Sequence, residues 1–127
     1  MDAQIAVYVL VGIVLLLFIK RTISVRSLKQ YLPTELDSLI QSKSNVVLLD
    51  VRTNDERQLG SIRGSIHIPL QTLRARTKEL DKYRNKQIVC YCQTGGRSVK
   101  AALQLRKSGF DIANLKGGMA DWNFTHR

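Results

Sequence analysis

The chain has 127 residues, enough for one small domain, and its 20 Lys and Arg residues against 10 Asp and Glu give a formal net charge of +10. Its two cysteines, Cys90 and Cys92, have neither the spacing of a zinc pair nor that of a Cys-x-x-Cys redox motif, and the two histidines are scattered. We therefore expect no metal and no cofactor. A structural disulfide between thiols this close together is not expected either, so the thiols should be reduced and the domain should face the cytosol.

An uncharged apolar run lies near the start of the sequence. It covers residues 5–19, and the longer stretch from Ala3 to Ile19, interrupted by Gln4, reaches the low end of the roughly 17–25 residues that a membrane-spanning helix needs. The pattern predicts a transmembrane anchor over residues 1–21. A cleaved signal peptide is an alternative, but it requires a basic segment before the run and a small-residue cleavage site after it. A buried helix is another, but roughly 100 further residues with a core of their own cannot easily cover it.

A basic segment follows the apolar run. Lys20, Arg21, Arg26 and Lys29 come before the next acidic residue, Glu35. Positive charge on this side of the span predicts a single-pass protein of a bacterial-type inner (plasma) membrane whose domain faces the cytoplasm. Nucleic-acid binding is the alternative interpretation of these charges, but no nucleic-acid motif accompanies them, so we expect no nucleic-acid partner. We interpret residues 22–33 as a basic connector that continues the helix or forms a short edge strand.

Strands and helices alternate over the remaining residues, 34–127. The sequence predicts a helix capped by Thr34, because acidic residues occupy its first turn. Continuous apolar runs with β-branched residues predict buried strands at 46–49 and 88–92. Shorter strands are expected at 65–68 and 112–115, and helical segments at 55–59, 70–80, 97–107 and 119–124. This alternation predicts an α/β domain with a mainly parallel central sheet flanked by helices.

The most informative stretch joins the second buried strand to the helix at 97–107. It reads Cys92-Gln93-Thr94-Gly95-Gly96-Arg97-Ser98. Ligands bind at such junctions in α/β sheets, because unpaired N–H groups and the positive end of the helix dipole gather there. We expect the two glycines to let the backbone curl and Arg97 to add a fixed positive charge. Such surroundings favour a thiolate, so Cys92 is the predicted catalytic nucleophile and residues 93–98 the predicted substrate-binding loop.

A core position is the alternative for either thiol. An inert, buried Cys92 would not need a Gly-Gly-Arg-Ser sequence after it. For Cys90, strand alternation predicts a side chain that packs against the sheet, which favours a structural role. A role as a resolving thiol is the alternative. A redox sensor that pairs Cys90 with Cys92 would need a strained disulfide.

The chain resembles the rhodanese family over residues 33–122. Four pieces carry the resemblance in the right order: Leu49-Asp50-Val51-Arg52 with Glu56, Gly60 to Pro69, Val89 to Ser98, and Leu115 to Trp122. The resemblance implies that the cysteine takes sulfur from a donor as a persulfide and passes it to a nucleophilic acceptor. The loop from Cys92 to Arg97 has the six-residue length of rhodaneses, whereas the related dual-specificity phosphatases have one residue more.

The resemblance also assigns supporting residues. Asp50 and Arg52 look like the pair of charged residues that the family has behind the loop. The alternative is that they form an ion pair at the end of a strand that only orders the chain. Many members that prefer thiosulfate have a basic residue where this chain has Gln93, so a protein persulfide or a small-thiol persulfide is an equally good candidate donor. The Gly117-Gly118 turn and Trp122 are interpreted as structural closure.

The predicted function is therefore that of a membrane-anchored sulfurtransferase. Its expected partners are a small sulfur donor or a protein persulfide, a thiol acceptor, and a neighbouring membrane protein. The alternative is a rhodanese-fold interaction module tethered beside a membrane partner, which would not need a reactive thiol.

Overall fold

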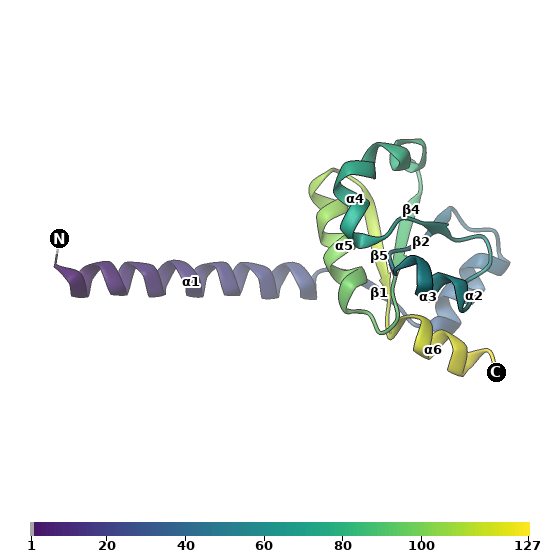
Figure 1. Ribbon diagram of the computed structural model, residues 1–127, viewed down its shortest axis with the longest axis horizontal. Helices are drawn as coiled ribbons and strands as arrows, with labels where there is room; N and C mark the ends of the chain where they lie inside the picture. The colour runs from purple at the N-terminus through teal and green to yellow at the C-terminus, as the bar shows by residue number, and fades with distance from the viewer. Residues whose placement is uncertain (1) are drawn as a thin grey trace.

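A long helix projects from a small α/β domain in the computed structural model, which describes residues 2–127 (Figure 1). Helix α1 (Ala3–Arg26) has no buried residue, so it does not belong to the core of the domain. Its mean hydropathy over an 18-residue window is 2.4, which makes it long and apolar enough to cross a membrane by length and composition. Met1 of the predicted anchor lies outside the described residues.

All strand pairings within residues 2–127 are parallel, and the sheet has the order β1-β5-β4-β2-β3. The strands are β1 (Lys29–Tyr31), β2 (Val46–Asp50), β3 (Ile66–His67), β4 (Gln87–Tyr91) and β5 (Asp111–Leu115). Strand β4 lies at the centre, so its carboxyl end opens onto the middle of one edge of the sheet. The α/β class with a parallel sheet is thus confirmed.

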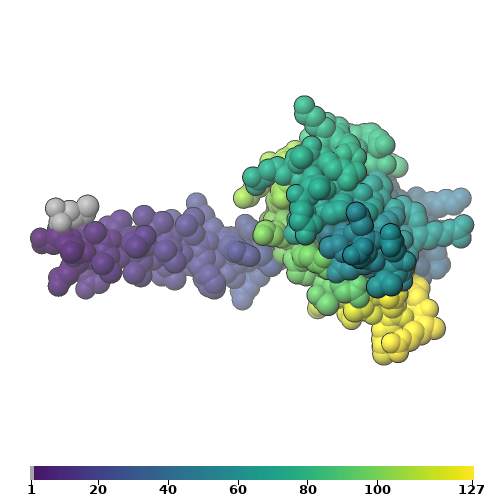
Figure 2. Space-filling view, viewed as in Figure 1, coloured from purple at the N-terminus to yellow at the C-terminus, as the bar shows by residue number. Residues whose placement is uncertain are grey.

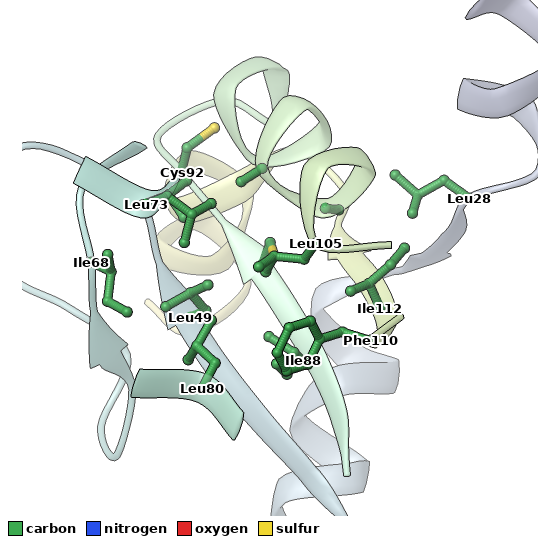
Figure 3. Packing of buried hydrophobic residues seen from close by; sticks show 14 residues of the cluster. Leu28, Leu49, Ile68, Leu73, Leu80, Ile88, Cys92, Leu105, Phe110 and Ile112 are labelled. Atoms are coloured by element: carbon green, nitrogen blue, oxygen red, sulfur yellow. The ribbon is translucent and has the colours of Figure 1, made fainter. Parts of the chain in front are cut away.

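Helices cover both faces of this sheet, as the alternation of the buried residues requires. The helical segments are α2 (Pro33–Gln41), α3 (Asn54–Gln58), α4 (Leu70–Arg76), the 3₁₀ helix η1 (Thr77–Tyr83), α5 (Gly96–Lys107) and α6 (Gly118–Thr125). On one face, Leu73 of α4, Leu80 of η1 and Leu105 of α5 belong to one apolar cluster (Figure 3), which also contains Cys90. The neighbouring Val89 and Tyr91 point to the other face, where Leu36 of α2 and Met119 of α6 complete a second core.

The start of α2 differs from the prediction. The helix begins at Pro33, and Leu32 rather than Thr34 occupies the capping position. The Glu35 carboxylate accepts a hydrogen bond from the Leu32 N–H at 2.8 Å. Proline suits the first helical position because its fixed φ is already helical and its missing N–H has no partner there. The cap at Thr34 was therefore wrong by two residues.

Two other segments have more detail than the expectation. Residues 22–33, interpreted as a connector that continues the helix or forms a short edge strand, do both: the first part continues α1 to Arg26, and Lys29–Tyr31 pairs with β5 as an edge strand. The helix predicted over 70–80 ends at Arg76, where the tighter η1 begins. The division into domains at residues 21 and 33 stays a prediction.

Candidate active site

Cys92 is the first residue beyond β4, and α5 begins four residues later at Gly96. The intervening backbone turns sharply through Gly95, whose φ of +111° is in the region that favours glycine. Cys92 has only 1% of its surface exposed, and Ser98 is fully buried on the first turn of α5. The exposed Thr94 lies at the tip of the loop. The structure thus places the predicted loop residues, 92–98, in one turn between β4 and α5, and Thr94, Gly95 and Ser98 are the ones that lie at the sulfur.

Hydrogen-bond donors surround the Cys92 sulfur. The Gly95 N–H donates to Sγ at 3.0 Å, and the Ser98 hydroxyl lies 3.4 Å from Sγ and 3.1 Å from the Gly95 carbonyl, the other acceptor for its proton. Burial raises the pKa of the Cys92 thiol, but hydrogen bonds from the Ser98 hydroxyl and from the backbone N–H groups of Ser98, Gly95 and Thr94 outweigh it, so the pKa lies below its ordinary value. The loop therefore favours a thiolate at this position.

The second thiol belongs to the same apolar cluster as Cys92, but its pKa shifts in the other direction. Cys90 is fully buried among apolar side chains, and burial raises its pKa to about 12. Its side chain lies on the α5 face of the sheet, as strand alternation predicted. Of the two cysteines, Cys92 alone has the surroundings of a nucleophile.

Helix α6 supports the loop from outside. The N–H groups of Met119 and Ala120 donate to the carbonyls of Cys92 and Gln93 at 2.8 and 3.0 Å. Gly118 makes this contact possible: its φ is +58°, and a Cβ there would lie 2.4 Å from the carbonyl oxygen of Cys92. The turn interpreted as structural closure thus also binds the active loop itself.

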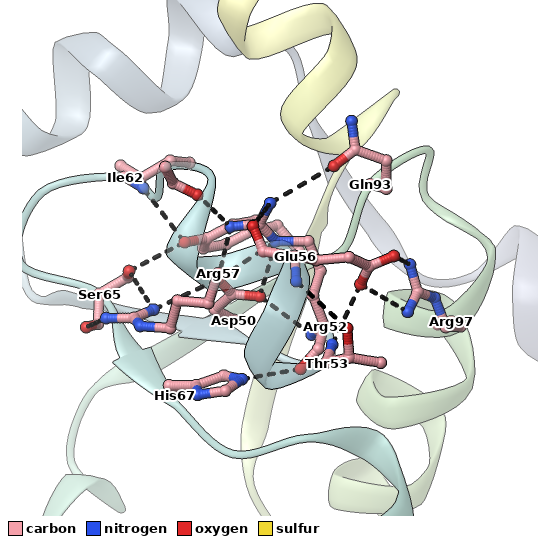
Figure 4. A network of polar contacts seen from close by, with 12 residues as sticks. Asp50, Arg52, Thr53, Glu56, Arg57, Ile62, Ser65, His67, Gln93 and Arg97 are labelled. Atoms are coloured by element: carbon pink, nitrogen blue, oxygen red, sulfur yellow. Dashed lines mark hydrogen bonds and ion pairs between the residues drawn. The ribbon is translucent and has the colours of Figure 1, made fainter.

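Arg97 is engaged by a carboxylate. Its guanidinium donates to both carboxylate oxygens of Glu56 at 2.8 Å (Figure 4). The hydrogen bonds from Arg97 hold the pKa of Glu56 below its ordinary value, and Glu56 in turn raises the pKa of Arg97. Glu56 is held in place by the start of α3, because its carboxylate also accepts from the Thr53 N–H at 3.0 Å. The expectation that Arg97 supplies charge at the sulfur misses this partner, since the hydrogen bonds to Sγ come from the loop backbone and Ser98.

Asp50 and Arg52 form a buried ion pair behind the loop, 2.9 Å apart. Burial raises the pKa of Asp50, but the hydrogen bonds and charge of Arg52 outweigh it, and the pKa is lowered. A second guanidinium, that of Arg57, reaches the same carboxylate at 3.2 Å and was not predicted from the sequence.

Arg52 connects this ion pair to the loop. Its Nη1 donates to the Gln93 side-chain oxygen at 3.4 Å, and its Nη2 donates to the Gly60 carbonyl at 2.6 Å. Gln93 therefore points toward Arg52. Within residues 2–127, no group of three His, Cys, Asp or Glu residues is arranged to hold a metal ion.

Known proteins share this architecture. A family model described as "Rhodanese-like domain" matches residues 32–125. This chain belongs to the rhodanese-like domain family. The resemblance stated from the motifs is thereby confirmed.

Two curated relatives illustrate the range of the family. The sulfurtransferase of Allochromatium vinosum is 32% identical over 88 residues, which are 68% of this chain and 80% of the relative. The tRNA uridine(34) hydroxylase of Cytophaga hutchinsonii is 34% identical over 98 residues, which are 74% of this chain and 31% of the relative. This rhodanese-like chain spans 31 to 59% of the length of the first curated relatives that it matches.

A solved structure of a sulfurtransferase has a similar fold. The thiosulfate sulfurtransferase of Pseudomonas aeruginosa superposes with a TM-score of 0.72 at 27% identity, covering 80% of this chain and 20% of that one. Relatives named as sulfurtransferases support sulfur transfer as the general activity of this rhodanese-like domain.

Proposed function

We propose that this protein is a membrane-anchored sulfurtransferase that carries sulfane sulfur as a persulfide on Cys92 and passes it to a thiol or another nucleophilic acceptor. The observation that carries the proposal is the environment of Sγ, which accepts a hydrogen bond from the Gly95 N–H at 3.0 Å and lies 3.4 Å from the Ser98 hydroxyl. Donors in this arrangement stabilise an anionic sulfur before the reaction and after it.

In the first step, the Cys92 thiolate attacks the sulfane sulfur of the donor. An S–S bond forms on Cys92, and the bond between that sulfur and the rest of the donor breaks. The leaving group departs with the electron pair, as sulfite from thiosulfate or as a thiolate from a persulfide. The loop N–H groups then face the new persulfide, whose charge is the same as that of the thiolate it replaces.

In the second step, the acceptor thiolate attacks the outer sulfur of the persulfide, and Cys92 leaves as a thiolate. A persulfide extends about 2 Å beyond Sγ, the length of one S–S bond. Because Cys92 itself is only 1% exposed, this extension moves the transferable atom toward the rim of the loop, where an acceptor can reach it.

Small-thiol or protein persulfides are the proposed donors ahead of thiosulfate. Gln93 brings no positive charge to the loop, and its side-chain oxygen accepts from Arg52 at 3.4 Å. The Arg97 guanidinium is paired with Glu56 at 2.8 Å. A dianionic donor therefore finds less uncompensated positive charge here than the loop sequence alone suggests.

A cyanide-coupled assay tests the proposal. The protein is turned over with thiosulfate or with glutathione persulfide as donor, and thiocyanate is measured. We expect activity with at least one donor, a larger kcat/KM with the persulfide, loss of activity in Cys92→Ser, and retention in the matched variant Cys90→Ser. Activity that survives Cys92→Ser, or a wild-type protein inactive with both donors, contradicts sulfur transfer through Cys92 and favours an interaction module.

We further propose that α1 anchors the domain in the inner membrane as a single span, with the domain in the cytoplasm. Three observations support this. The mean hydropathy of α1 reaches 2.4, the helix has no buried residue, and the side chains of Lys20, Arg21 and Arg26 lie on the domain side of the span. Anchoring would restrict acceptors to molecules that reach the membrane surface, a neighbouring membrane protein among them.

A further inference from the structure

A basic groove lies between α4 and α5, away from the active loop. It has a volume of about 520 Å³ and is lined by Arg74, Ala75, Thr77, Lys78, Gln104, Lys107 and Ser108. Its three cationic side chains, Arg74, Lys78 and Lys107, are exposed. Within residues 2–127, none of the three forms an ion pair, and none of the residues that line the groove is acidic. The sulfur chemistry at Cys92 does not use this groove.

The groove lies on the side of the domain from which α1 extends. Figure 2 shows the green α5 and teal α4 atoms on the side of the domain that faces the α1 shaft. Arg106, next to Lys107 on α5, donates to the Ser24 carbonyl at 2.8 Å and to the Ser27 hydroxyl at 3.2 Å. These bonds join α5 to the last turn of α1 and fix the direction of the groove relative to the helix.

The length of α1 places this face close to lipid headgroups. The apolar run ends at Ile19, and the helical rise from Lys20 to Arg26 is about 9 Å. The headgroup layer on each side of a bilayer is roughly 5–7 Å thick. The domain therefore begins near the outer edge of that layer, and cationic side chains on the side of the domain next to Arg26 are the ones that lie nearest the lipid phosphates.

We propose that the groove between α4 and α5 binds the headgroups of anionic phospholipids in the membrane that holds α1. The inference rests on the proposed anchoring and is independent of sulfur transfer. Docking through this groove uses the carboxyl-terminal end of α5, whereas the active loop precedes Gly96 at the other end, about 16 Å away along the helix. A docked domain would thus hold its active loop away from the lipid surface, open to an acceptor.

Hydrogen–deuterium exchange of the full chain in nanodiscs tests this proposal. Exchange is compared in discs of phosphatidylcholine and in discs that also contain phosphatidylglycerol. We expect the amides of 74–78 and of the last turn of α5 to exchange several-fold more slowly in the anionic discs, and added salt to abolish the difference. Inorganic phosphate added to the neutral discs should not reproduce the protection, since that result would indicate a free-phosphate site.

Two matched double variants locate the effect. Arg74→Gln with Lys107→Gln removes two charges from the groove, whereas Arg63→Gln with Lys43→Gln removes one arginine and one lysine from exposed positions outside it. At about fivefold per cation, the first pair of substitutions should weaken docking roughly 25-fold, whereas the second pair should keep most of the protection. Both should retain sulfur transfer, which shows that they fold.

Three results would overturn the inference. Equal exchange of an inserted wild-type chain in both discs would mean that the groove binds no anionic lipid. Equal losses in the two double variants would mean that only the total charge matters. A chain that does not insert into nanodiscs would remove both the anchor and the docking, while the thiocyanate assay would still report on the proposed chemistry.

Discussion

Two thiols separated by one residue have opposite chemistry in this protein. Cys90 points into an apolar core, where burial raises its pKa to about 12. Cys92 lies beyond the end of β4, where backbone N–H groups and the Ser98 hydroxyl outweigh burial and lower its pKa. The end of the strand therefore decides which cysteine can be a nucleophile, because the chain turns there into the start of a helix.

The Ser98 hydroxyl should control the pH dependence of sulfur transfer. The thiolate fraction of Cys92 rises as the pH increases through its lowered pKa and is constant above it. Ser98→Ala removes one hydrogen bond to the sulfur, so the pKa should rise and the pH–rate profile should move to higher pH. A hydrogen bond to a charged group contributes about 1.5–3 kcal/mol, so kcat/KM at pH values below the wild-type pKa should fall roughly tenfold or more, and the loss should shrink as the pH rises to the new pKa. A lower rate with an unmoved profile would mean that Ser98 only packs.

The buried carboxylate of Asp50 should make stability depend on pH. Its pKa is lower in the folded chain than in the unfolded one, so its contribution is complete above the ordinary value of 3.8 and is lost as the pH falls through the folded pKa. Asp50→Asn leaves the guanidiniums of Arg52 and Arg57 without their shared partner. We expect a loss of about 3–5 kcal/mol at neutral pH and a flatter decline in acid, measured by urea unfolding. The exposed Asp55→Asn is the control, and equal losses in the two variants would contradict the role of burial.

At the scale of elements, α6 holds the active loop through its first turn. Gly118→Ala would place a Cβ 2.4 Å from the Cys92 carbonyl oxygen and 2.8 Å from the Gln93 carbonyl carbon, at a φ of +58°. The expected result is a loss of more than about 2 kcal/mol in stability, together with reduced sulfur transfer as the loop shifts. Gly64→Ala isolates the backbone strain, because Gly64 has a φ of +82° but no atom within 4 Å of the place that a Cβ would occupy. Similar activity losses in both variants would argue against a specific contact between α6 and the loop.

Local sequence patterns predicted most of the helices and strands, because the residues that favour each element lie within it or next to it. Apolar runs gave β2 and β4 to within a residue or two, and the Gly-Gly-Arg-Ser sequence located the loop before α5. The cap of α2 was misplaced because Thr34 is a good cap in isolation, whereas Pro33 already occupies the first helical position. A preference of about 1 kcal/mol for one capping residue cannot override a proline whose backbone is fixed.

The residues that pair with the side chains and carbonyls of the candidate site could not be predicted from the sequence in the same way. The Arg97–Glu56 pair joins residues 41 positions apart, and Arg57 reaches Asp50 only after α3 folds beside β2. The contact of Met119 with the Cys92 carbonyl depends on α6 returning to the end of β4. Spacing along the chain predicts a candidate nucleophile and its loop, but the pairing of charged side chains depends on the tertiary structure.

At the scale of the whole molecule, the proposed anchoring by α1 would restrict sulfur transfer to the membrane surface. If the domain faces the cytoplasm, protease added outside intact cells should leave it whole, and permeabilising the inner membrane should expose it to digestion. The protein should also remain with the membrane after an alkaline wash, because a single apolar helix inserts essentially irreversibly. Digestion in intact cells would reverse the orientation, and release by the wash would exclude a spanning α1.

The intact mass of the full chain tests most directly whether one sulfur atom is carried on Cys92. The reduced protein is treated with glutathione persulfide, freed of donor and weighed, and the modified residue is located by peptide mapping. We expect a gain of one sulfur on Cys92 that cyanide removes as thiocyanate, no gain in Cys92→Ser, and the same gain in Cys90→Ser. An unchanged mass, or an added sulfur that maps to Cys90, would contradict sulfur transfer through Cys92.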